Sequence, residues 1–562
     1  DNDAATGVTP TLDPAKAAGR IVICDRGVSA RTDKSQAVKN AGGIGMVQTN
    51  TTDAQSLNGD FHSVPSIHVN ATSGAKIKAY AASATAPTAT ISAVSIDPVD
   101  APSMAGFSSY GPALAGEGDL LKPDITAPGV DVIAAISQDP KTGAPRFDAM
   151  SGTSMSAPHI SGLAALMKQK FPTWSPAAIK SAMMTTARQT TNDGKPIQWA
   201  EGDATPLNFG AGEVVPARAY NPGLVYEAGL DEWLTYACSI DQLQIIAGPE
   251  ACAQTKPTDP SDLNYPTIAI GALAGKQTVT RTVTNVEKKA TQYTATVKAP
   301  AGTKVTVSPT SLTVPPGQSR SFTVTIERTT AALDDYTFGQ LVWTGNRGQS
   351  VQSQIAVRPV ALAAAQEVVA TGATGSTALT VTPGFTGTVS TDVDGLVAST
   401  QSTVQVVRKD GSVIDGYQAF TVPTGTRVTR VATYADEVPA KDIDLNLYRV
   451  AADGTVKAVG SAGQDGSSEM FTGVLAPGDY IVAVDLFSNE AHAAVPLHVW
   501  NLGDQATGNL TVTPAQVPAA SGVAATVTAS WSGLEAGKHY LGQVNFLDGS
   551  KTLRGTLLTV DA

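Results

Sequence analysis

The chain has 562 residues, more than one hydrophobic core usually supports, so we expect about three or four domains. Only 15% of the residues are charged, the formal net charge is −11, and no Lys/Arg cluster suited to a phosphate backbone occurs. Nucleic acid is therefore excluded as an expected partner. The Thr-, Ser-, Gly-, Ala- and Val-rich composition is typical of secreted, β-rich modules.

Residues 1–97 alternate short apolar strands with helical segments. Strands are predicted within "GRIVIC" (19–24), "AGGIGMVQTN" (41–50) and "SVPSIHV" (63–69), and a helix is predicted over 75–83. This pattern indicates an α/β module that ends near residue 97.

Residues 98–254 begin with segments punctuated by Gly and Pro and continue with two helices. Val130, Val132 and Ile133 predict a buried strand. Each helix carries apolar residues at i, i+3, i+4 and i+7, which share one face. These positions are Ile160, Leu163, Ala164 and Met167 in the first helix, and Ile179, Ala182, Met183 and Thr186 in the second. Ser175 and Pro176 are suited to be the N-cap and first residue of the second helix.

After residue 255 the apolar period changes from helical to alternating. In "SFTVTIER", Phe322, Val324 and Ile326 alternate with threonines, which predicts a half-buried strand. Similar runs predict a β-sandwich over 255–362 and one or two further β-sandwich modules over 363–562. The Ala-rich segment 361–367 is interpreted as a linker.

The chain has three cysteines, too few for a disulfide scaffold and without the spacing of a zinc site. Cys238 and Cys252 are near enough in sequence to form a disulfide in an oxidising compartment. Cys24 has no evident partner, so missing sequence and a buried free thiol both remain open.

The sequence contains neither a membrane-span pattern nor a signal-peptide pattern. It has no run of about 18 apolar residues, so no membrane span is expected. The first residue is Asp and no signal-peptide pattern follows, so we expect the chain to begin within a longer protein.

The segment "GTSMSAPHISGLAALMKQKFPTWSPAAIKSAMMTTA" (152–187) resembles the nucleophile region of subtilisin-like serine proteases. "FSSYGP" (107–112) and "LKPDITAPGVDVIAA" (121–135) are similar to the segment that precedes it in that family. The motifs of residues 19–69 resemble the protease-associated domain that cucumisin-like subtilases insert. "FGAGEVVPARAYNPGLVYE" (209–227) and "LNYPTIAI" (263–270) resemble the C-terminal continuation of that branch.

This resemblance implies a multidomain protein with a partial α/β subtilisin-like catalytic domain. An inserted α/β protease-associated domain (1–97) would precede the second half of the catalytic domain (98–254), and fibronectin III-like β-sandwich modules (255–362 and 363–562) would follow. Ser154 would be the nucleophile at a helix N-terminus, with its amide and the Thr153 hydroxyl supporting an oxyanion. The family's Asp, His and oxyanion Asn are expected upstream of residue 1, since no Asp-Thr-Gly or His-Gly-Thr-His motif occurs.

None of the six histidines is predicted to activate Ser154. His159 is five residues further along the helix and is rotated by about 140° from Ser154, so we expect it to be a packed structural residue. The other five are interpreted as surface or core histidines. They are His62 and His68 in the first module and His492, His498 and His539 in the C-terminal modules.

Asp124 is interpreted as a structural turn residue, since it has no histidine to orient. Asp442 and its neighbours in "DIDLN" alternate with apolar residues and lack a glycine-bearing acidic loop, so no metal is expected there. The sequence predicts neither a metal nor a cofactor.

Two functions are compatible with these features. The first is a secreted serine endopeptidase that acts on polypeptides through an acyl-enzyme, with the upstream catalytic half as an obligate partner. The chain alone would then be inactive and poorly soluble, because the base and the neighbouring strands would be absent. The alternative is a non-catalytic extracellular binding protein that has retained the scaffold. The intact motif around Ser154 favours the first.

Overall fold

The computed structural model describes residues 11–562 except 54, 94–99, 200–201, 241, 243–248, 254, 257, 410–411 and 415. The chain divides into two compact units. The first extends to Leu273 and also contains Gln277–Pro359, and the second comprises Ala274–Lys276 and Val360–Ala562. Each unit is described by itself.

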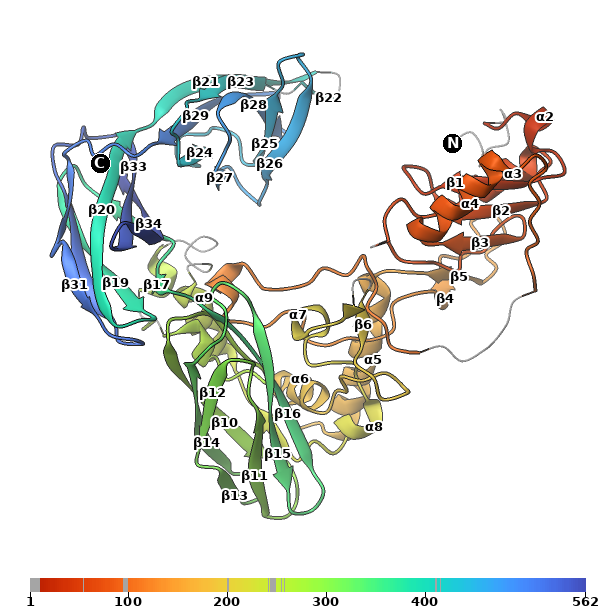
Figure 1. Cartoon of the computed structure of the whole chain (residues 1–562), viewed down its shortest axis with the longest axis horizontal. Helices are drawn as coiled ribbons and strands as arrows, with labels where there is room; N and C mark the ends of the chain where they lie inside the picture. The colour runs from red at the N-terminus through yellow and green to blue at the C-terminus, as the bar shows by residue number, and fades with distance from the viewer. Residues whose placement is uncertain are drawn as a thin grey trace. The chain divides into compact units, whose positions relative to one another are not determined.

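The first unit begins with a small α/β module (Figure 1). The three strands that the sequence predicts are β1 (Ile21–Asp25), β2 (Gly45–Thr49) and β3 (Ser66–Val69), and they form a parallel sheet of the order β1-β2-β3. The helices are α2 (Pro14–Ala17), α3 (Arg31–Asn40) and α4 (Ala71–Ser83). A Cβ on Gly74 would lie 2.7 Å from Cβ of Thr49, so glycine is required where α4 crosses β2.

Two helices follow in the next segment and pack on each other as their apolar spacing predicts. They are α5 (Thr153–Lys170) and α6 (Pro176–Thr185). Leu163 and Met167 of α5 are buried in one cluster with Ile179 and Met183 of α6. The Ser175 hydroxyl accepts a hydrogen bond of 2.9 Å from the Ala178 amide, which confirms the predicted N-cap.

Short elements complete this segment. They are η1 (Ala115–Gly118), β4 (Val132–Ile136), β5 (Arg146–Met150), β6 (Gln198–Trp199), β7 (Gly202–Asp203), α7 (Pro206–Phe209), α8 (Pro216–Ala219), β8 (Leu224–Tyr226), α9 (Leu230–Ser239), η2 (Pro249–Cys252) and η3 (Pro260–Asp262). Among the helices of the described ranges, none is both long enough and apolar enough to cross a lipid bilayer.

The strand predicted around Val130 to Ile133 forms, but the prediction that it is buried is wrong. Within the described residues β4 pairs with a single strand, β5, in an antiparallel ladder. Ile133 is 68% exposed and Val130 39% exposed, because no further layer of the described chain covers this two-stranded ribbon.

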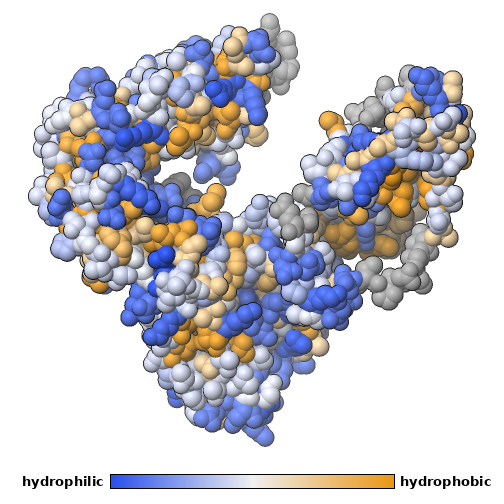
Figure 2. Space-filling model, viewed as in Figure 1, coloured by the Kyte–Doolittle hydropathy of each residue, from blue (hydrophilic) through white to orange (hydrophobic). Residues whose placement is uncertain are grey.

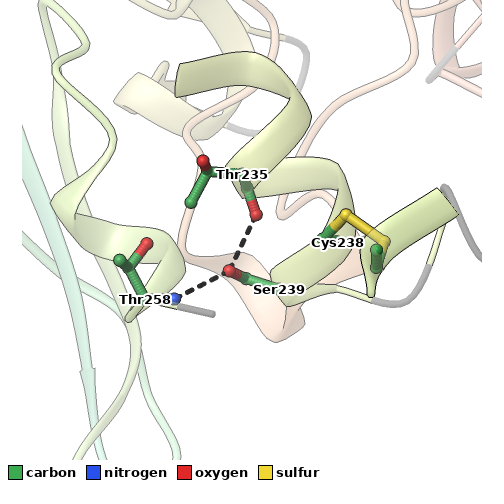
Figure 3. The surroundings of a disulfide bond; sticks show 5 residues. Thr235, Cys238, Ser239 and Thr258 are labelled. Atoms are coloured by element: carbon green, nitrogen blue, oxygen red, sulfur yellow. Dashed lines mark hydrogen bonds between the residues drawn. A yellow bond between two sulfur atoms is a disulfide. The ribbon is translucent and has the colours of Figure 1, made fainter. Parts of the chain in front are cut away.

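A disulfide closes the loop after α9 (Figure 3). Cys238 is bonded to Cys252, the pair that the sequence suggests. Next to it, the Ser239 hydroxyl donates to the Thr235 carbonyl at 2.8 Å and accepts from the Thr258 amide at 3.0 Å. The end of α9 is thus fixed both to its own last turn and to the chain beyond the loop.

The first unit ends in a β-sandwich whose core alternates as the sequence predicts. Phe322, Val324 and Ile326 are buried, and the Phe322 ring meets Trp343 edge-on at 5.0 Å. One sheet has the order β12-β14-β10-β8 and the other β13-β11-β15-β16-β9. The bounds not yet given are β9 (Ile268–Leu273), β10 (Lys276–Asn285), β11 (Thr291–Lys298), β12 (Thr303–Ser308), β13 (Ser311–Val314), β14 (Ser319–Arg328), β15 (Thr337–Gly345) and β16 (Ser350–Pro359).

Strand β8 lies across the boundary that the sequence suggests at residues 254 and 255. It precedes that boundary in the chain but pairs antiparallel with β10 of the sandwich. The Tyr226 hydroxyl is 2.9 Å from the Ser353 hydroxyl in the opposite sheet, while its amide donates to Ser181 of α6 at 2.8 Å. The helical segment and the sandwich therefore share a strand.

The second unit contains two β-sandwiches, one inserted into the other. We call the outer one the host sandwich. Its sheets have the orders β17-β19-β32-β30 and β18-β34-β33-β20-β31. Its strands are β17 (Leu362–Ala364), β18 (Glu367–Thr371), β19 (Gly375–Pro383), β20 (Gly387–Ala398), β30 (Leu510–Thr513), β31 (Gln516–Ala519), β32 (Ala525–Trp531), β33 (His539–Asp548) and β34 (Lys551–Asp561). The linker predicted over 361–367 is wrong, because β17 and the start of β18 occupy it.

The inserted sandwich is formed by residues 400–502, between β20 and β30. Its sheets have the orders β22-β21-β29-β24-β27 and β23-β28-β25-β26. Its strands are β21 (Thr400–Lys409), β22 (Ser412–Ile414), β23 (Gly416–Val422), β24 (Val428–Ala432), β25 (Ile443–Val450), β26 (Val456–Ala462), β27 (Met470–Gly473), β28 (Gly478–Leu486) and β29 (His492–Leu502). Both sheets agree with the β-sandwich that the alternating sequence predicts for this part of the chain.

Candidate active site

Ser154 is the second residue of α5, the helix labelled in Figure 1, and it is exposed. Thr153, which begins the helix, is exposed as well. The first amides of a helix have no partner within the helix and lie at the positive end of its dipole. Negative charge on a carbonyl oxygen beside Ser154 would therefore be stabilised by this helix end. Both predicted oxyanion donors, the Ser154 amide and the Thr153 hydroxyl, belong to the same end.

The loop that precedes β4 holds this end of α5 in place. The Ser156 hydroxyl donates to the Ala127 carbonyl at 2.8 Å, and the Gly152 amide donates to the Gly129 carbonyl at 2.8 Å. A Cβ on Gly129 would lie 2.9 Å from the Gly152 carbonyl oxygen, so the two backbones approach more closely than any other residue at 129 would permit.

A second contact fixes the residues just before the helix. The Ser151 hydroxyl donates to the Asp131 carboxylate at 3.0 Å and accepts from the Asp131 amide at 2.9 Å. Asp131 has φ of 53°, a left-handed conformation that is uncommon for a residue other than glycine. The reciprocal bonds with Ser151 stabilise that conformation.

As the sequence predicts, His159 makes no hydrogen bond with Ser154. The expectation that His159 is a packed structural residue is wrong. Its side chain is exposed, and Nδ1 lies 2.9 Å from the carbonyl of Met155, one turn earlier in the same helix. The imidazole is thereby directed along its own helix. In the part of the chain that the structure describes, the Ser154 hydroxyl makes no hydrogen bond with a histidine.

The remaining histidines lie elsewhere. His62 and His68 belong to the N-terminal module, where burial lowers the pKa of both imidazoles. His68 accepts from the Asn58 amide at 3.0 Å and lies 2.7 Å from the Asn50 side chain, as expected for a structural histidine. His492, His498 and His539 belong to the second unit.

Asp124 holds together three parts of the first unit. Its carboxylate pairs with Lys122 at 2.7 Å and with Lys180 of α6 at 2.6 Å, and accepts from the Tyr265 hydroxyl at 2.6 Å. Burial opposes its ionisation, but the charges of Lys180 and Lys122 prevail and lower the pKa of Asp124. Its contacts are those of a structural anchor, in line with the interpretation from sequence.

Large apolar side chains are exposed on α5, which carries Ser154, and on the two strands β4 and β5 that precede it. Ile133 of β4 and Phe147 of β5 are each 68% exposed, Met150 is 46% exposed, and Leu166 of α5 is 56% exposed. Figure 2 shows hydrophobic surface in the region of β4 and β5. Where exposed apolar side chains are contiguous, they mark an interaction surface.

One group of side chains in the second unit has the composition of a metal site, and sequence reasoning missed it. Glu437, His498 and His539 place their ligand atoms within 4.8 Å of one another. They are distributed over three segments with no short spacing between them, so no local motif signals their convergence. The acidic residues of "DIDLN" are not part of this group.

Comparison with known proteins finds similar sequences for two parts of the chain. Residues 27–212 match the model of the subtilase family, and residues 262–357 match a fibronectin type-III domain. The chain is 41% identical over 366 residues to subtilisin-like protease SBT5.3 of Arabidopsis thaliana, covering 62% of this chain and 47% of that protein. It is 42% identical over 361 residues to subtilisin-like protease SBT1.3 of the same plant, covering 59% of this chain and 45% of that protein. The chain thus spans about half the length of these relatives. Within this multidomain chain, residues 27–212 are thus similar to the subtilase family.

Proposed function

We propose that Ser154 is the nucleophile of a secreted subtilisin-like serine endopeptidase. The observation that carries this proposal is the exposed position of Ser154 at the start of α5, within an intact "GTSMSAPH" segment and at the positive end of the helix dipole. A structural N-cap serine would not need the close approach of Gly129 to Gly152 that holds this turn.

In the proposed reaction, Ser154 Oγ attacks the carbonyl carbon of a peptide bond. Its proton passes to a histidine base and then to the leaving amine, and a covalent acyl-enzyme forms. The Ser154 amide and the Thr153 hydroxyl stabilise the negative oxygen of the tetrahedral intermediate. Water then attacks the acyl group and releases the second product.

The base, its orienting aspartate and the oxyanion asparagine are proposed to come from polypeptide outside this chain. Two observations support this. The chain spans about half of its subtilisin-like relatives, and the apolar side chains of β4, β5 and α5 lie exposed. Polypeptide that supplies these groups would also cover this face, so the chain alone is expected to be inactive.

The other modules are proposed to assist this activity. The α/β module of residues 11–93 is proposed to be an inserted protease-associated domain that influences substrate access, with a parallel sheet of the order β1-β2-β3 as its support. The disulfide between Cys238 and Cys252 supports a secreted protein, because such bonds persist in oxidising compartments. The β-sandwiches would buttress the catalytic domain or bind polymers and surfaces.

A fluorophosphonate probe, which reacts with activated serines, tests the proposal. The full-length gene product that carries this chain should be labelled at Ser154, and Ser154→Ala should abolish the label. Ser161→Ala is the matched control, because Ser161 lies in the same helix and its hydroxyl donates only to the Ala157 carbonyl one turn back, at 3.2 Å. Peptide mapping identifies the modified residue.

The same probe separates the competing explanations. In a subtilisin, loss of the base system costs on the order of 10⁶-fold in kcat, so the 562-residue chain alone should show no specific label. Labelling of the chain alone would contradict the proposal that the histidine base comes from outside this chain. A folded full-length protein that remains unlabelled at Ser154 would instead indicate a non-catalytic binding protein.

A further inference from the structure

The host and inserted sandwiches of the second unit meet at a cluster of two histidines and a carboxylate. His498 lies in β29 of the inserted sandwich, Glu437 follows β24 of the same sandwich, and His539 begins β33 of the host sandwich. His498 Nε2 is 2.8 Å from one carboxylate oxygen of Glu437, and His539 Nε2 is 3.2 Å from the other. In each imidazole, Nε2 is therefore the nitrogen that faces the Glu437 carboxylate.

We propose that Glu437, His498 and His539 bind a divalent transition-metal ion of the zinc type, and that the ion joins the host sandwich to the inserted sandwich. Two imidazoles and one carboxylate form a ligand set that zinc accepts, with a fourth position left for water. Hard cations such as Ca²⁺ and Mg²⁺ prefer oxygen ligands, so the two nitrogens select against them.

The ligand atoms of the three side chains lie within 4.8 Å of one another, and they would move closer together around an ion. Ligand atoms about 2.0 to 2.2 Å from a tetrahedral ion lie about 3.3 Å from one another. The nitrogen–oxygen separations of 2.8 and 3.2 Å are therefore shorter by about half an ångström or less. An ion would take the place of a proton at each Nε2, as metal binding to histidine requires.

The outer nitrogens of both rings have partners that would orient them toward an ion. His539 Nδ1 is 2.6 Å from the carboxylate of Asp561, and His498 Nδ1 is 2.9 Å from the Ser399 hydroxyl. Histidines that bind metals almost always donate this second N–H to a carboxylate or another oxygen, which fixes the tautomer and the ring plane. The Tyr434 ring stacks on His539 at 3.9 Å and further restricts its rotation.

Burial and charge are also compatible with occupancy. The side chain of His498 is only 4% exposed, whereas those of His539 and Glu437 are 16% and 27% exposed. The site is thus shielded on one side and open to a hydrated ion on the other. The carboxylates of Glu437 and Asp561 together balance the two positive charges of the ion.

The position of the cluster gives the ion a structural consequence. The sandwiches already meet through Trp500 and Leu502 of β29 and Leu541 of β33, which are buried together, and the Trp500 indole donates to the His539 carbonyl at 3.3 Å. An ion bound by His498 and His539 would connect these same two strands directly. Its removal should loosen the contact between the sandwiches without unfolding either core.

Zinc binding by the full chain, fused to maltose-binding protein and purified without a histidine tag, tests the site. After EDTA treatment and dialysis, competition with a chromogenic chelator should show one tightly bound zinc per chain. His498→Gln, His539→Gln and Glu437→Gln should each weaken binding by more than about 100-fold, since even outer partners contribute 10 to 100-fold. Asp561→Asn, which alters a positioning residue, should weaken it by about 10 to 100-fold.

His492→Gln is the matched control, because His492 lies exposed in the same strand as His498 and is not a member of the cluster. It should leave zinc affinity unchanged. Zinc should also raise the thermal midpoint of the wild-type chain but not of His539→Gln, and bound cobalt(II) should show the visible absorption of a tetrahedral site. Equal zinc affinity in wild type, His498→Gln and His539→Gln would overturn the proposal and leave a hydrogen-bonded cluster without an ion.

Discussion

Ser156 donates a hydrogen bond of 2.8 Å to the Ala127 carbonyl, and this bond ties the first turn of α5 to the loop before β4. Ser156→Ala should therefore displace the helix end that carries Ser154. We expect a loss of about 1 to 2 kcal/mol in the free energy of unfolding, because a partly buried carbonyl loses its partner. In the full-length protein, the rate of fluorophosphonate labelling at Ser154 should fall as well. Ser161→Ala should change neither quantity, and an unaltered labelling rate in Ser156→Ala would show that the bond does not position the nucleophile.

Asp119 should make the first unit less stable as the pH rises. Burial raises the pKa of Asp119 to about 7, and the nearby carboxylates of Asp259 and Glu117 add to this effect. Its stabilising contribution is complete below the unfolded pKa, near 4, and is lost as the pH rises through about 7.

Asp119→Asn should consequently be more stable than wild type at about pH 8, by roughly 2 to 4 kcal/mol, and equal to it near pH 4. Asparagine keeps the oxygen that accepts from the Gly271 amide at 2.8 Å. Urea midpoints measured across this pH range check the prediction. The exposed Asp335→Asn serves as the control, and a constant difference at all pH values would exclude titration of Asp119 as the cause.

Asp124 should have the opposite pH dependence. Its pKa is lowered, so its contribution to stability is present above the unfolded pKa near 4 and is lost as the pH falls through the lower folded value. Asp124→Asn removes the partner of Lys122 and Lys180, and we expect a loss of about 1 to 3 kcal/mol near pH 7. Urea unfolding at about pH 7 and about pH 3 should show this difference shrinking in acid. A difference that persists undiminished in acid would point to packing instead of charge.

The exposed apolar face should make the chain associate when it is alone. Replacing Ile133 with Thr and Phe147 with Ser should reduce this association, because each side chain is 68% exposed. The thermal midpoint should change little, since neither residue is in a described core. Light scattering and size-exclusion chromatography measure the effect. Val474→Thr, which alters an 80% exposed residue of the second unit, should leave association unchanged.

The parts of the fold that the sequence predicts are those set by local chemistry. Ser175 and Pro176 mark the start of α6, and the apolar spacing of both helices identifies the faces that bury Leu163 and Ile179. The alternation around Phe322 likewise identifies β14. In each case the pattern lies within a few residues, so it can be recognised without the rest of the chain.

The features that the sequence does not predict depend on residues far apart. A resemblance identifies Ser154, but not the contact of Gly129 with Gly152 that holds its turn. The burial of the strand near Ile133 was expected from its composition, and the prediction fails because burial depends on neighbours that the described chain lacks. His498 and His539 converge only through the meeting of two sandwiches, which no periodicity reveals.

The position of strand β8 limits where the chain can be divided for expression. An expression boundary placed at residue 255 would remove β8, one of the two neighbours of β10, and leave Ser353 without the Tyr226 hydroxyl. The excised sandwich would then present an unpaired edge to solvent, a frequent origin of aggregation. A cut made before residue 224 preserves that edge but takes from α6 the amide that satisfies Ser181, so the two pieces are best produced as one.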